Sequence, residues 1–340
     1  MDEPPFVTVD DYEPVARERL PADVYDYYAG GAGDEWTLAE NRHAFERWNL
    51  RPRFLRGASD PDTSTEILGT RLSFPVLLAP WAYQRMAHPE GELATAKAAA
   101  RAGTIMVVSS TAEAFLEEVA AATEGPKWWQ LYVAEDRGFT ADMLGRVVAA
   151  GFGAICWTVD FTVNGLRHRD TRSGFEMPLG LENSGYVYDG SISWDDVPWI
   201  RESAPGLPIL VKGLLTAEDA ELALQAGVDG IVVSNHGGRQ LDRSPAALDA
   251  LPEIVQAVGG RAPVLMDGGV RRGVDVVTAL ALGASAVLVG RPAVWGLAVA
   301  GEDGVVDVLR ILREEFENAM ALTGCRTVEE IGPALVAPAR

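Results

Sequence analysis

Short apolar runs that end in small or polar residues recur along the chain after Phe74. They are rich in Val, Ile and Leu and do not alternate with polar residues, a pattern typical of strands buried on both faces, as in a parallel sheet. Eight such runs are present, at residues 74–80, 104–110, 128–133, 154–160, 208–213, 230–235, 263–269 and 286–292.

Helical patterns lie between most of these runs. Thr216 precedes AEDAELALQAG and Glu90 precedes GELATAKAAARAG, each at a position suited to a helix N-cap. The second of these patterns ends at Gly103, the residue type expected just past a helix. Eight alternating strand and helix units in one chain favour a closed (β/α)₈ barrel, the TIM barrel, over an open sheet.

Two parts of the chain do not follow this rhythm. Residues 1–60 contain helical segments but no strand of the series, which predicts an N-terminal helical cap on the barrel. Residues 161–207, between the fourth and fifth predicted strands, form a far longer connection than the usual loop of about 2–6 residues. They predict a lid over the barrel mouth. With the barrel at 74–300 and a C-terminal helix and tail at 301–340, we expect a single domain.

The chain is acidic, with 29 Lys and Arg against 49 Asp and Glu and a formal net charge of −20. This excess argues against a nucleic-acid partner, because phosphate backbones are bound by basic patches. Cys156 and Cys325 are far apart in sequence and form no CxxC, which favours a reducing compartment without disulfides. No secretory signal and no membrane-spanning run is recognisable, so we expect a soluble, cytoplasmic protein without a membrane partner.

In barrels of this type the reactive groups lie on the loops that follow the carboxyl ends of the strands. We therefore read off the residues that each predicted strand delivers there. They are Pro80, Trp81, Ala82 and Tyr83; Ser109, Ser110 and Thr111; Gln130 and Tyr132; Thr158 and Asp160; Lys212; Ser234, Asn235 and His236; Asp267, Gly268 and Gly269; and Gly290 and Arg291. A purely structural barrel does not need polar residues at every strand end.

Two glycine- and arginine-containing motifs follow the seventh and eighth predicted strands, MDGGVRRG at 266–273 and LVGRP at 288–292. Barrels of this type bind phosphate on these loops. Glycines let backbone N–H groups approach an anion, and Arg271 and Arg291 add charged donors. Turn glycines and solvated arginines are the alternative, but two such motifs in consecutive loops favour a phosphate-bearing ligand.

The absence of other motifs narrows the identity of this ligand. No GxGxxG opens a helix after a strand and no GxxxxGK[ST] is present, which argues against a Rossmann-bound dinucleotide and a nucleoside triphosphate. The motifs HExxH and CxxC are absent, so the sequence does not indicate a catalytic metal. A mononucleotide such as FMN remains, and Lys212, at the end of the fifth run, suits stabilisation of negative charge on a reduced flavin.

The stretch VSNHGGRQLD places His236 and Arg239 on a glycine-containing turn after the sixth predicted strand. An imidazole accepts protons near neutral pH, and a guanidinium binds a carboxylate through two parallel hydrogen bonds. A base beside a carboxylate clamp suits oxidation of a 2-hydroxy acid at its α-carbon. A capping or surface role is the alternative for His236 and Arg239. Asp160 is placed to pair with His236 and stabilise the imidazolium that forms.

Three further residues are candidates for contact with the substrate. Arg167 is either a second carboxylate donor or a partner in a salt bridge of the lid. Tyr27 and Tyr132 are candidate hydroxyl donors, although for Tyr27 the local sequence on its own favours simple helix packing.

Several segments resemble the FMN-dependent α-hydroxy acid oxidases and dehydrogenases, the enzymes of glycolate, lactate and mandelate oxidation. They are YDYYAGGAGDEWTLAENRHAF, MAHPEGE, QLYV, TVD, LVKG, SNHGGRQLD, DGGVRRG and LALGASAVLVGRP, and the resemblance runs from about residue 9 to residue 330. It implies one FMN hydroxy acid dehydrogenase domain over 1–340. It also implies a homo-oligomer, a tetramer or an octamer.

The resemblance assigns roles to individual residues. His236 would be the active-site base paired with Asp160, Arg239 and Arg167 would hold the substrate carboxylate, and Tyr27 and Tyr132 would bind substrate. The residues implied to contact FMN are Pro80, Trp81, Ala82, Ser109, Gln130, Thr158, Lys212 and Ser234, with its phosphate among Asp267, Gly268, Gly269, Val270, Arg271, Gly290 and Arg291. The implied reaction removes the α-proton and passes two electrons to the flavin, and in the oxidases O₂ then becomes hydrogen peroxide.

The chain departs from the family pattern at several positions. Thr111 stands where glycolate-type members carry tryptophan, and Trp81 and Tyr83 replace a threonine and a methionine that are common there. The smaller side chain at 111 favours a larger, mandelate-like substrate, around which Trp81 and Tyr83 either stack or fill space. Leu166 replaces a common arginine, and the excursion at 161–207 is shorter than in glycolate-type members.

Three other functions remain open at this point. They are a dehydrogenase that passes electrons to a quinone or protein, an FMN-dependent isomerase on the same fold, and a non-catalytic flavin-binding protein. The complete set of His236, Arg239, Arg167, Tyr27 and Tyr132 argues against the last two.

Overall fold

Eight parallel strands form a closed barrel in the computed structural model, which describes residues 6–176 and 188–339. The strands are β4 (Val76–Leu78), β5 (Met106–Val108), β6 (Lys127–Leu131), β7 (Ile155–Thr158), β8 (Ile209–Leu214), β9 (Gly230–Val233), β10 (Val264–Asp267) and β11 (Ala286–Val289). Each overlaps one of the eight predicted runs, and pairing of β11 with β4 closes the barrel. The predicted TIM barrel is confirmed.

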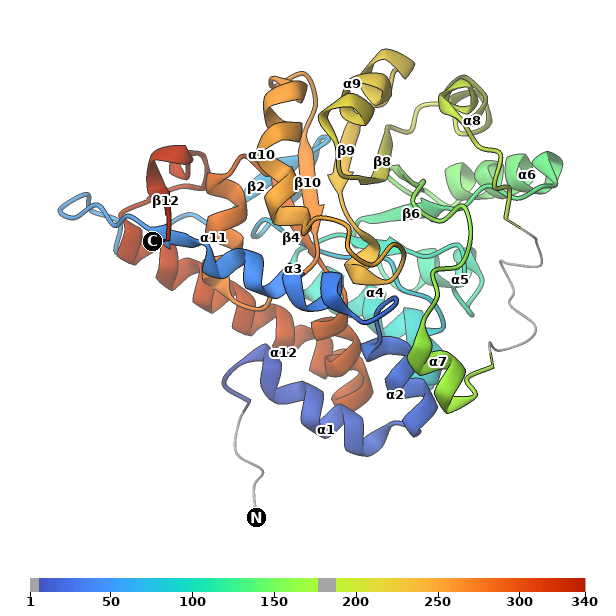
Figure 1. Ribbon diagram of the computed structural model, residues 1–340, viewed down its shortest axis with the longest axis horizontal. Helices are drawn as coiled ribbons and strands as arrows, with labels where there is room; N and C mark the ends of the chain where they lie inside the picture. Colours follow the sequence, from blue (N-terminus) through green and yellow to red (C-terminus); the bar gives the residue numbers. More distant parts are fainter. Residues whose placement is uncertain (1–5, 177–187, 340) are drawn as a thin grey trace.

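Helices surround the barrel and cover one end of it (Figure 1). Those that follow the strands are α4 (Gly91–Ala102), α5 (Leu116–Ala121), α6 (Arg137–Ala149), α7 (His168–Ser173), α8 (Val197–Ser203), α9 (Ala217–Ala226), α10 (Ala247–Val258), α11 (Gly273–Ala281) and α12 (Arg291–Thr323). The N-terminal segment contributes α1 (Tyr12–Arg19), α2 (Ala22–Ala29) and α3 (Trp36–Glu46). These three helices match the helical segments expected within residues 1–60.

The strand side chains belong to two separate buried clusters. Leu77, Val107, Cys156 and Leu288 lie in the smaller cluster, whereas their strand neighbours join the large cluster shared with the helices. Because successive side chains of a strand point to opposite faces, the smaller cluster fills the barrel and the larger one lies between the sheet and the helices. Burial on both faces explains why the strand sequences are continuously apolar.

The helix ends were predicted with mixed success. Thr216 is the N-cap of α9, where its hydroxyl accepts a hydrogen bond from the Asp219 N–H at 3.2 Å, and Gly103 ends α4 with a φ of +69°. Glu90 occupies the predicted N-cap position of α4, but it does not cap the helix through its side chain. Its backbone is already helical (φ −78°, ψ −17°) and its side chain makes no capping bond, because capping needs an extended backbone at that residue.

Two small sheets were not predicted, and one of them joins the segment after α3 to the C-terminal segment. Strand β1 (Trp48–Leu50) pairs antiparallel with β12 (Val336–Pro338), and another two-stranded sheet consists of β2 (Thr65–Ile67) and β3 (Thr70–Leu72). β1, β2 and β3 do not lie in continuous apolar runs of the kind that marked the barrel strands.

The excursion between β7 and β8 is described only in part, because residues 177–187 of the predicted lid lie outside the described residues. The part that follows is held to the segment after β6 by an antiparallel bridge between Ala134 and Tyr188. Arg137 extends this attachment through ion pairs with Asp189 (2.6 Å) and Asp196 (3.1 Å).

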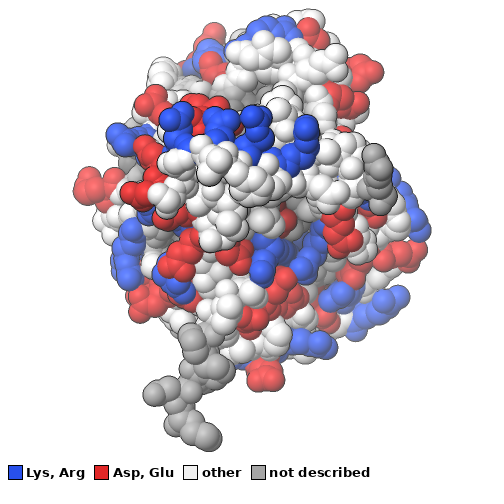
Figure 2. Space-filling view, turned by 90° about the vertical axis from the view of Figure 1, so that its left-hand side faces the viewer, with Lys and Arg blue, Asp and Glu red and all other residues white. Residues whose placement is uncertain are grey.

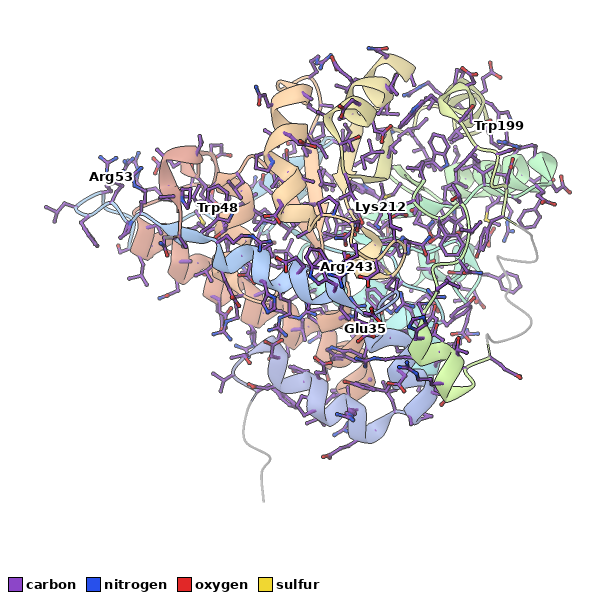
Figure 3. All side chains as sticks on the ribbon, in the orientation of Figure 1. Glu35, Trp48, Arg53, Trp199, Lys212 and Arg243 are labelled. Atoms are coloured by element: carbon purple, nitrogen blue, oxygen red, sulfur yellow. The ribbon has the colours of Figure 1, made fainter. Side chains whose placement is uncertain are left out.

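The surface carries both signs of charge. On the face that lies to the left in Figure 1, acidic and basic side chains are interspersed (Figure 2). Lys212 of β8 lies near the centre of the barrel, far from Arg53 and Trp199, which lie near opposite ends of the molecule (Figure 3).

Within residues 6–176 and 188–339, no helix combines the length and apolar character that crossing a membrane requires. Both cysteines are buried as free thiols.

Helix α12 bends at Ala300 and Gly301 and brings Gly296 against Gly304. A Cβ atom added at Gly304 would lie 1.9 Å from the Gly296 carbonyl oxygen, so substitution requires the backbones to separate. We expect Gly304→Ala to lower the free energy of unfolding by about 1–3 kcal/mol. Urea titration followed by circular dichroism measures this change.

Gly145 in α6 provides the matched control, because it is exposed and a Cβ atom there would meet nothing within 4 Å. Gly145→Ala should raise the free energy of unfolding by about 0.5–1 kcal/mol, since alanine loses less backbone entropy in a helix. Equal effects of the two substitutions would contradict the close glycine contact.

Candidate active site

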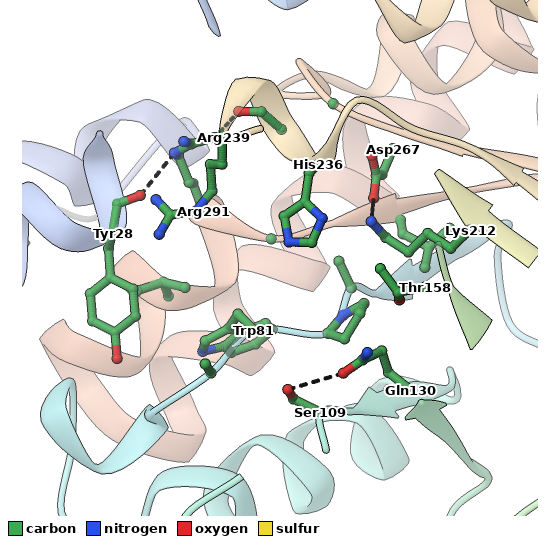
Figure 4. A pocket seen from close by; sticks show the side chains of 18 of the residues that line it. Tyr28, Trp81, Ser109, Gln130, Thr158, Lys212, His236, Arg239, Asp267 and Arg291 are labelled. Atoms are coloured by element: carbon green, nitrogen blue, oxygen red, sulfur yellow. Dashed lines mark hydrogen bonds and ion pairs between the residues drawn. The ribbon is translucent and has the colours of Figure 1, made fainter. Parts of the chain in front are cut away.

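A cavity of about 370 Å³ opens at the carboxyl end of the barrel strands (Figure 4). Its size is within the range of about 300–1,000 Å³ typical of small-molecule sites. It is lined by all the predicted site residues except Asp160 and Ser234, each of which hydrogen-bonds to a residue that does line it. Strand ends far apart in sequence therefore converge on one cavity.

His236 lies in an unusual backbone conformation. Its φ is +58°, and Gly237 and Gly238 follow with φ of +63° and +75°. A left-handed conformation at a residue other than glycine costs about 1–3 kcal/mol and persists only where neighbours enforce it. Here the Ser234 hydroxyl accepts the His236 N–H at 3.0 Å, and the Asn235 side chain accepts the Gly238 N–H at 3.0 Å. This turn presents the imidazole to the cavity.

A reciprocal amide pair anchors the His236 turn to the N-terminal segment. The Asn41 amide on α3 donates to the Asn235 oxygen at 2.9 Å, and the Asn235 amide donates back at 2.7 Å. Both side chains are buried, where an unpaired amide would cost free energy. The position of the His236 turn therefore depends on a helix that is distant in sequence.

The imidazole of His236 lies between a carboxylate and a phenol. Its Nδ1 is 2.9 Å from Asp160 Oδ1, and its Nε2 is 3.4 Å from the Tyr132 hydroxyl. Burial on its own would raise the pKa of Asp160, but the neighbouring His236 and Lys212 outweigh burial and lower it. Asp160 is thus ionised and accepts a hydrogen bond from the Nδ1–H of His236, which leaves Nε2 as the proton acceptor on the cavity side.

Lys212 is a buried cation beside the same cavity (Figure 4). Its ammonium group donates to the Ser234 hydroxyl at 2.9 Å and pairs with Asp267 at 3.2 Å. Burial works to lower the pKa of Lys212, but the carboxylates of Asp267 and Asp160 outweigh it and raise the pKa. A fixed positive charge therefore adjoins the cavity.

Two polar atoms in the cavity wall have no hydrogen-bond partner in the part of the chain that the structure describes. The Gln130 oxygen accepts hydrogen bonds from Ser110 N–H (3.1 Å) and the Ser109 hydroxyl (3.2 Å), which fixes the orientation of the amide. The Gln130 Nε2 and Thr158 Oγ1 atoms are buried without a hydrogen-bond partner among the described residues. Such groups cost free energy until something binds them, so they favour a polar ligand at this wall.

Arg239, Arg271 and Arg291 bring three partly buried guanidinium groups to the cavity. Burial lowers the pKa of all three, and Arg239 and Arg271 help to lower that of Arg291 to about 9. Crowded, partly buried cations favour binding of an anion.

Arg291 also has a structural contribution that was not predicted. It donates to the carbonyls of Tyr28 (3.0 Å), Gly30 (2.8 Å) and Gly237 (3.0 Å), and so ties the end of α2 to the His236 turn. Arg239 donates to the Tyr27 and Gly30 carbonyls at 2.6 and 2.9 Å. Cations are favoured at such a helix C-terminus, where carbonyls lack helical partners.

Tyr27 lines the cavity and lies among charged and aromatic neighbours, of which Arg239 and Arg167 line the cavity too. The guanidinium carbons of Arg239 and Arg167 lie 4.9 and 5.7 Å from the centre of its ring, and Phe175 stacks on it at 4.4 Å. Arg167 also pairs with Asp170 at 2.8 Å, so it both lines the cavity and makes the salt bridge considered as its alternative.

Several lining residues were missed in the sequence. Tyr28 adjoins Tyr27, and Phe161 directly follows Asp160, so adjacency to predicted residues was their available signal. Tyr188 had no such signal, because it is far in sequence from every predicted site residue. Its ring, with those of Tyr132 and Phe161, forms a cluster with centroids 4.9–5.0 Å apart. Leu166, the residue that replaces a common arginine, is exposed and does not line the cavity.

Comparison with known proteins identifies the family. The family described as FMN-dependent dehydrogenase matches residues 16–338. The chain belongs to this family. Glycolate oxidase from Spinacia oleracea is 51% identical over 98% of this chain and 96% of the relative, and glycolate oxidase 3 from Arabidopsis thaliana is 51% identical over 96% and 94%. The resemblance found in the sequence is confirmed.

Solved structures give the same result. A mandelate oxidase with (S)-2-phenylpropionate has a TM-score of 0.93 and 44% identity, and a mutant of the active chimera of (S)-mandelate dehydrogenase has a TM-score of 0.94 and 37% identity. Each similarity covers 98% of this chain and 99% of the other. The expected cofactor, FMN, and the expected class, an FMN-dependent oxidoreductase, are thus confirmed.

The cavity of this FMN-dependent dehydrogenase family member fits the chemistry of FMN. Gln130 Nε2 and Thr158 Oγ1, which have no hydrogen-bond partner among the described residues, suit the polar ring edge of a flavin. Lys212 suits negative charge on that ring. Arg271 and Arg291 lie with Gly268, Gly269 and Gly290 on the loops after β10 and β11, where such barrels bind phosphate.

Arg271 and Arg272 provide a test of the phosphate site, because they are adjacent but differ in exposure, with 12% and 45% of their side chains accessible. We expect Arg271→Ala to weaken FMN binding at least about tenfold, because a hydrogen bond to a charged group is worth about 1.5–3 kcal/mol. Riboflavin, which lacks the phosphate, should bind nearly as before. Quenching of flavin fluorescence on addition of flavin-free protein measures both.

Arg272→Ala is the matched control and should leave FMN binding unchanged, since Arg272 pairs with Glu315 outside the cavity. If both variants bound FMN as the unsubstituted protein does, the phosphate site would lie elsewhere.

Proposed function

We propose that this protein oxidises (S)-2-hydroxy acids larger than glycolate, of the mandelate type, to 2-oxo acids, and that O₂ accepts the electrons and becomes hydrogen peroxide. The observation that carries this proposal is the His236 imidazole, held on Asp160 through Nδ1 at 2.9 Å, in a cavity that Arg239, Arg167 and Tyr132 also line. Together they supply a base, carboxylate-binding cations and a hydroxyl donor.

Each of these residues has a distinct part in the proposed reaction. Bound FMN supplies the two-electron oxidising capacity. Arg239 and Arg167 bind the substrate carboxylate and orient the α-carbon towards Nε2 of His236, which accepts a proton. Asp160 stabilises the imidazolium that results. Tyr27 and Tyr132 donate hydroxyl hydrogen bonds that hold the substrate.

Thr111 and Tyr83 lie where their side chains limit the size of the substrate. Both line the cavity, and the short Thr111 side chain is only 4% exposed, so a larger residue there would project into the space available to substrate. The glycolate oxidase relatives favour a small substrate. The mandelate oxidase neighbours, one of them solved with benzoyl-formic acid, support a larger one. Aromatic rings from Tyr132, Phe161 and Tyr188 add apolar surface suited to a phenyl group.

A dehydrogenase that passes electrons to a quinone or a protein is the second candidate, supported by the (S)-mandelate dehydrogenase neighbour. It would form hydrogen peroxide only slowly in air. An isomerase is the weaker alternative, because it does not need the base and carboxylate clamp. Assembly into a tetramer or octamer and location in the cytoplasm stay predictions.

Anaerobic titration of the FMN-loaded protein with a panel of aliphatic and aromatic 2-hydroxy acids tests the proposal. We expect (S)-mandelate to bleach the flavin absorbance and admission of air to yield stoichiometric hydrogen peroxide. His236→Ala should remain yellow and folded but bleach about 10²–10⁴-fold more slowly, because it lacks the proton acceptor.

His43→Ala is the control, since that histidine is 58% exposed on α3 and lies outside the cavity. It should bleach at the unsubstituted rate. Normal bleaching of His236→Ala would remove the base from the proposal, and failure of every hydroxy acid to bleach the flavin would remove the function.

Substitution of Thr111 tests the argument from substrate size. Thr111→Trp should lower the ratio of kcat/KM for (S)-mandelate to that for glycolate at least about tenfold, because the indole occupies space needed by the phenyl group. Thr111→Ser keeps the hydroxyl that lies 2.7 Å from the Ser109 hydroxyl and should preserve the ratio. A ratio unaffected by tryptophan would show that residue 111 does not limit substrate size.

A further inference from the structure

A completely buried glutamate lies outside the cavity, against the two loops that form one of its walls. Glu92, in the first turn of α4, is 0% exposed. Its Oε1 accepts the Glu113 N–H at 3.1 Å and the Gln84 N–H at 3.4 Å. Gln84 lies on the loop after β4 and Glu113 on the loop after β5, so a single oxygen atom joins the two loops.

The same two loops are linked at further points. The Tyr83 N–H donates to the Thr111 carbonyl at 3.5 Å, and the Arg85 N–H donates to the Glu113 carboxylate at 2.7 Å. The Thr95 hydroxyl, one turn along α4 from Glu92, donates to the Gln84 side-chain oxygen at 2.6 Å. Glu92 thus belongs to a buried network directly behind Tyr83 and Thr111.

Tyr83 depends on this network for its conformation. Its φ is +59°, in the left-handed region that costs a residue other than glycine about 1–3 kcal/mol. The Tyr28 hydroxyl donates to the Tyr83 carbonyl at 2.5 Å on one side, and Glu92 accepts the N–H of the next residue, Gln84, on the other. Without the Glu92 oxygen, Tyr83 can relax and move its ring relative to the cavity.

The burial of Glu92 is costly. Burial raises the pKa of Glu92 above its ordinary value, and no cation among the described residues lowers it. Its Oε2 atom is buried without a hydrogen-bond partner there. A leucine of similar size would avoid this cost, so the value of the carboxylate lies in the geometry that it imposes on the loops.

We propose that Glu92 is a positioning residue that holds the Tyr83 loop and the Thr111 loop at a set separation and thereby determines which substrate side chains the cavity accepts. The inference rests on the proposed oxidation of 2-hydroxy acids. Glu92 does not line the cavity, and His236 lies on the loop after β9. Its substitution therefore acts on the KM of substrates that contact this wall and leaves proton removal largely intact.

Three variants of the FMN-loaded enzyme test this inference. Glu92→Leu removes both acceptors, Glu92→Asp withdraws the carboxylate by one methylene, and Glu92→Gln keeps an oxygen acceptor without the charge. We expect Glu92→Leu and Glu92→Asp to change the ratio of kcat/KM for (S)-mandelate to that for glycolate at least about tenfold, mainly through KM. Glu92→Gln should stay within about threefold of the unsubstituted ratio, because its carbonyl still accepts both N–H groups.

Glu90→Gln is the matched control, since Glu90 is exposed two residues earlier and makes no side-chain capping bond. It should leave the ratio unchanged. In a Tyr83→Ala background, Glu92→Asp should add little further change to the ratio, because Glu92 acts through Tyr83. If Glu92→Leu does not fold, Glu92→Asp and this double variant decide the question.

Equal loss of kcat/KM for both substrates, an unchanged ratio in Glu92→Asp, or a Glu92→Gln ratio as altered as that of Glu92→Leu would overturn the inference. Failure of the unsubstituted enzyme to oxidise any 2-hydroxy acid would instead overturn the proposed function. The dissociation constants of benzoylformate and glyoxylate, measured from the flavin spectrum, give a second readout that should change in the same sense.

Discussion

The hydrogen bond between Asp160 and Nδ1 of His236 is the interaction on which the candidate active site depends. It selects which ring nitrogen faces the cavity, and it requires an ionised carboxylate in a buried place. Lys212 meets that requirement, because its charge helps to keep Asp160 ionised, and Asp267 in turn holds the charge of Lys212. Lys212 of β8 and Asp267 of β10 thus form one electrostatic unit with Asp160 and His236, which lie on the loops after the neighbouring strands β7 and β9.

The N-terminal segment completes this unit. Tyr27 and Tyr28 on α2 line the cavity, Asn41 on α3 pairs with Asn235, and Arg239 and Arg291 donate to carbonyls at the end of α2. The cap is therefore bound to the barrel through the same residues that form the site. Folding of the cap and formation of the cavity are coupled for this reason.

Hydrogen bonds from neighbouring residues offset the backbone strain in the cavity wall. His236 and Tyr83 both have positive φ, and each is held by hydrogen bonds to the residues beside it. Rigid surroundings let a binding site keep such conformations in the absence of ligand. These hydrogen bonds hold His236 and Tyr83 in the positions from which they line the cavity.

The sequence by itself determined the barrel, because burial on both faces of a parallel strand leaves continuous apolar runs, and it determined most site residues, because each follows such a run. It did not reveal Glu92 as a link between loops, the carbonyl contacts of Arg291, the short β1–β12 pair or Tyr188 in the cavity. These features are contacts between segments that are distant in sequence and come together only in the folded protein. The residues adjacent to them in the chain therefore do not indicate them. Local pattern records burial and turns, whereas the partner of a buried polar group is decided by tertiary structure.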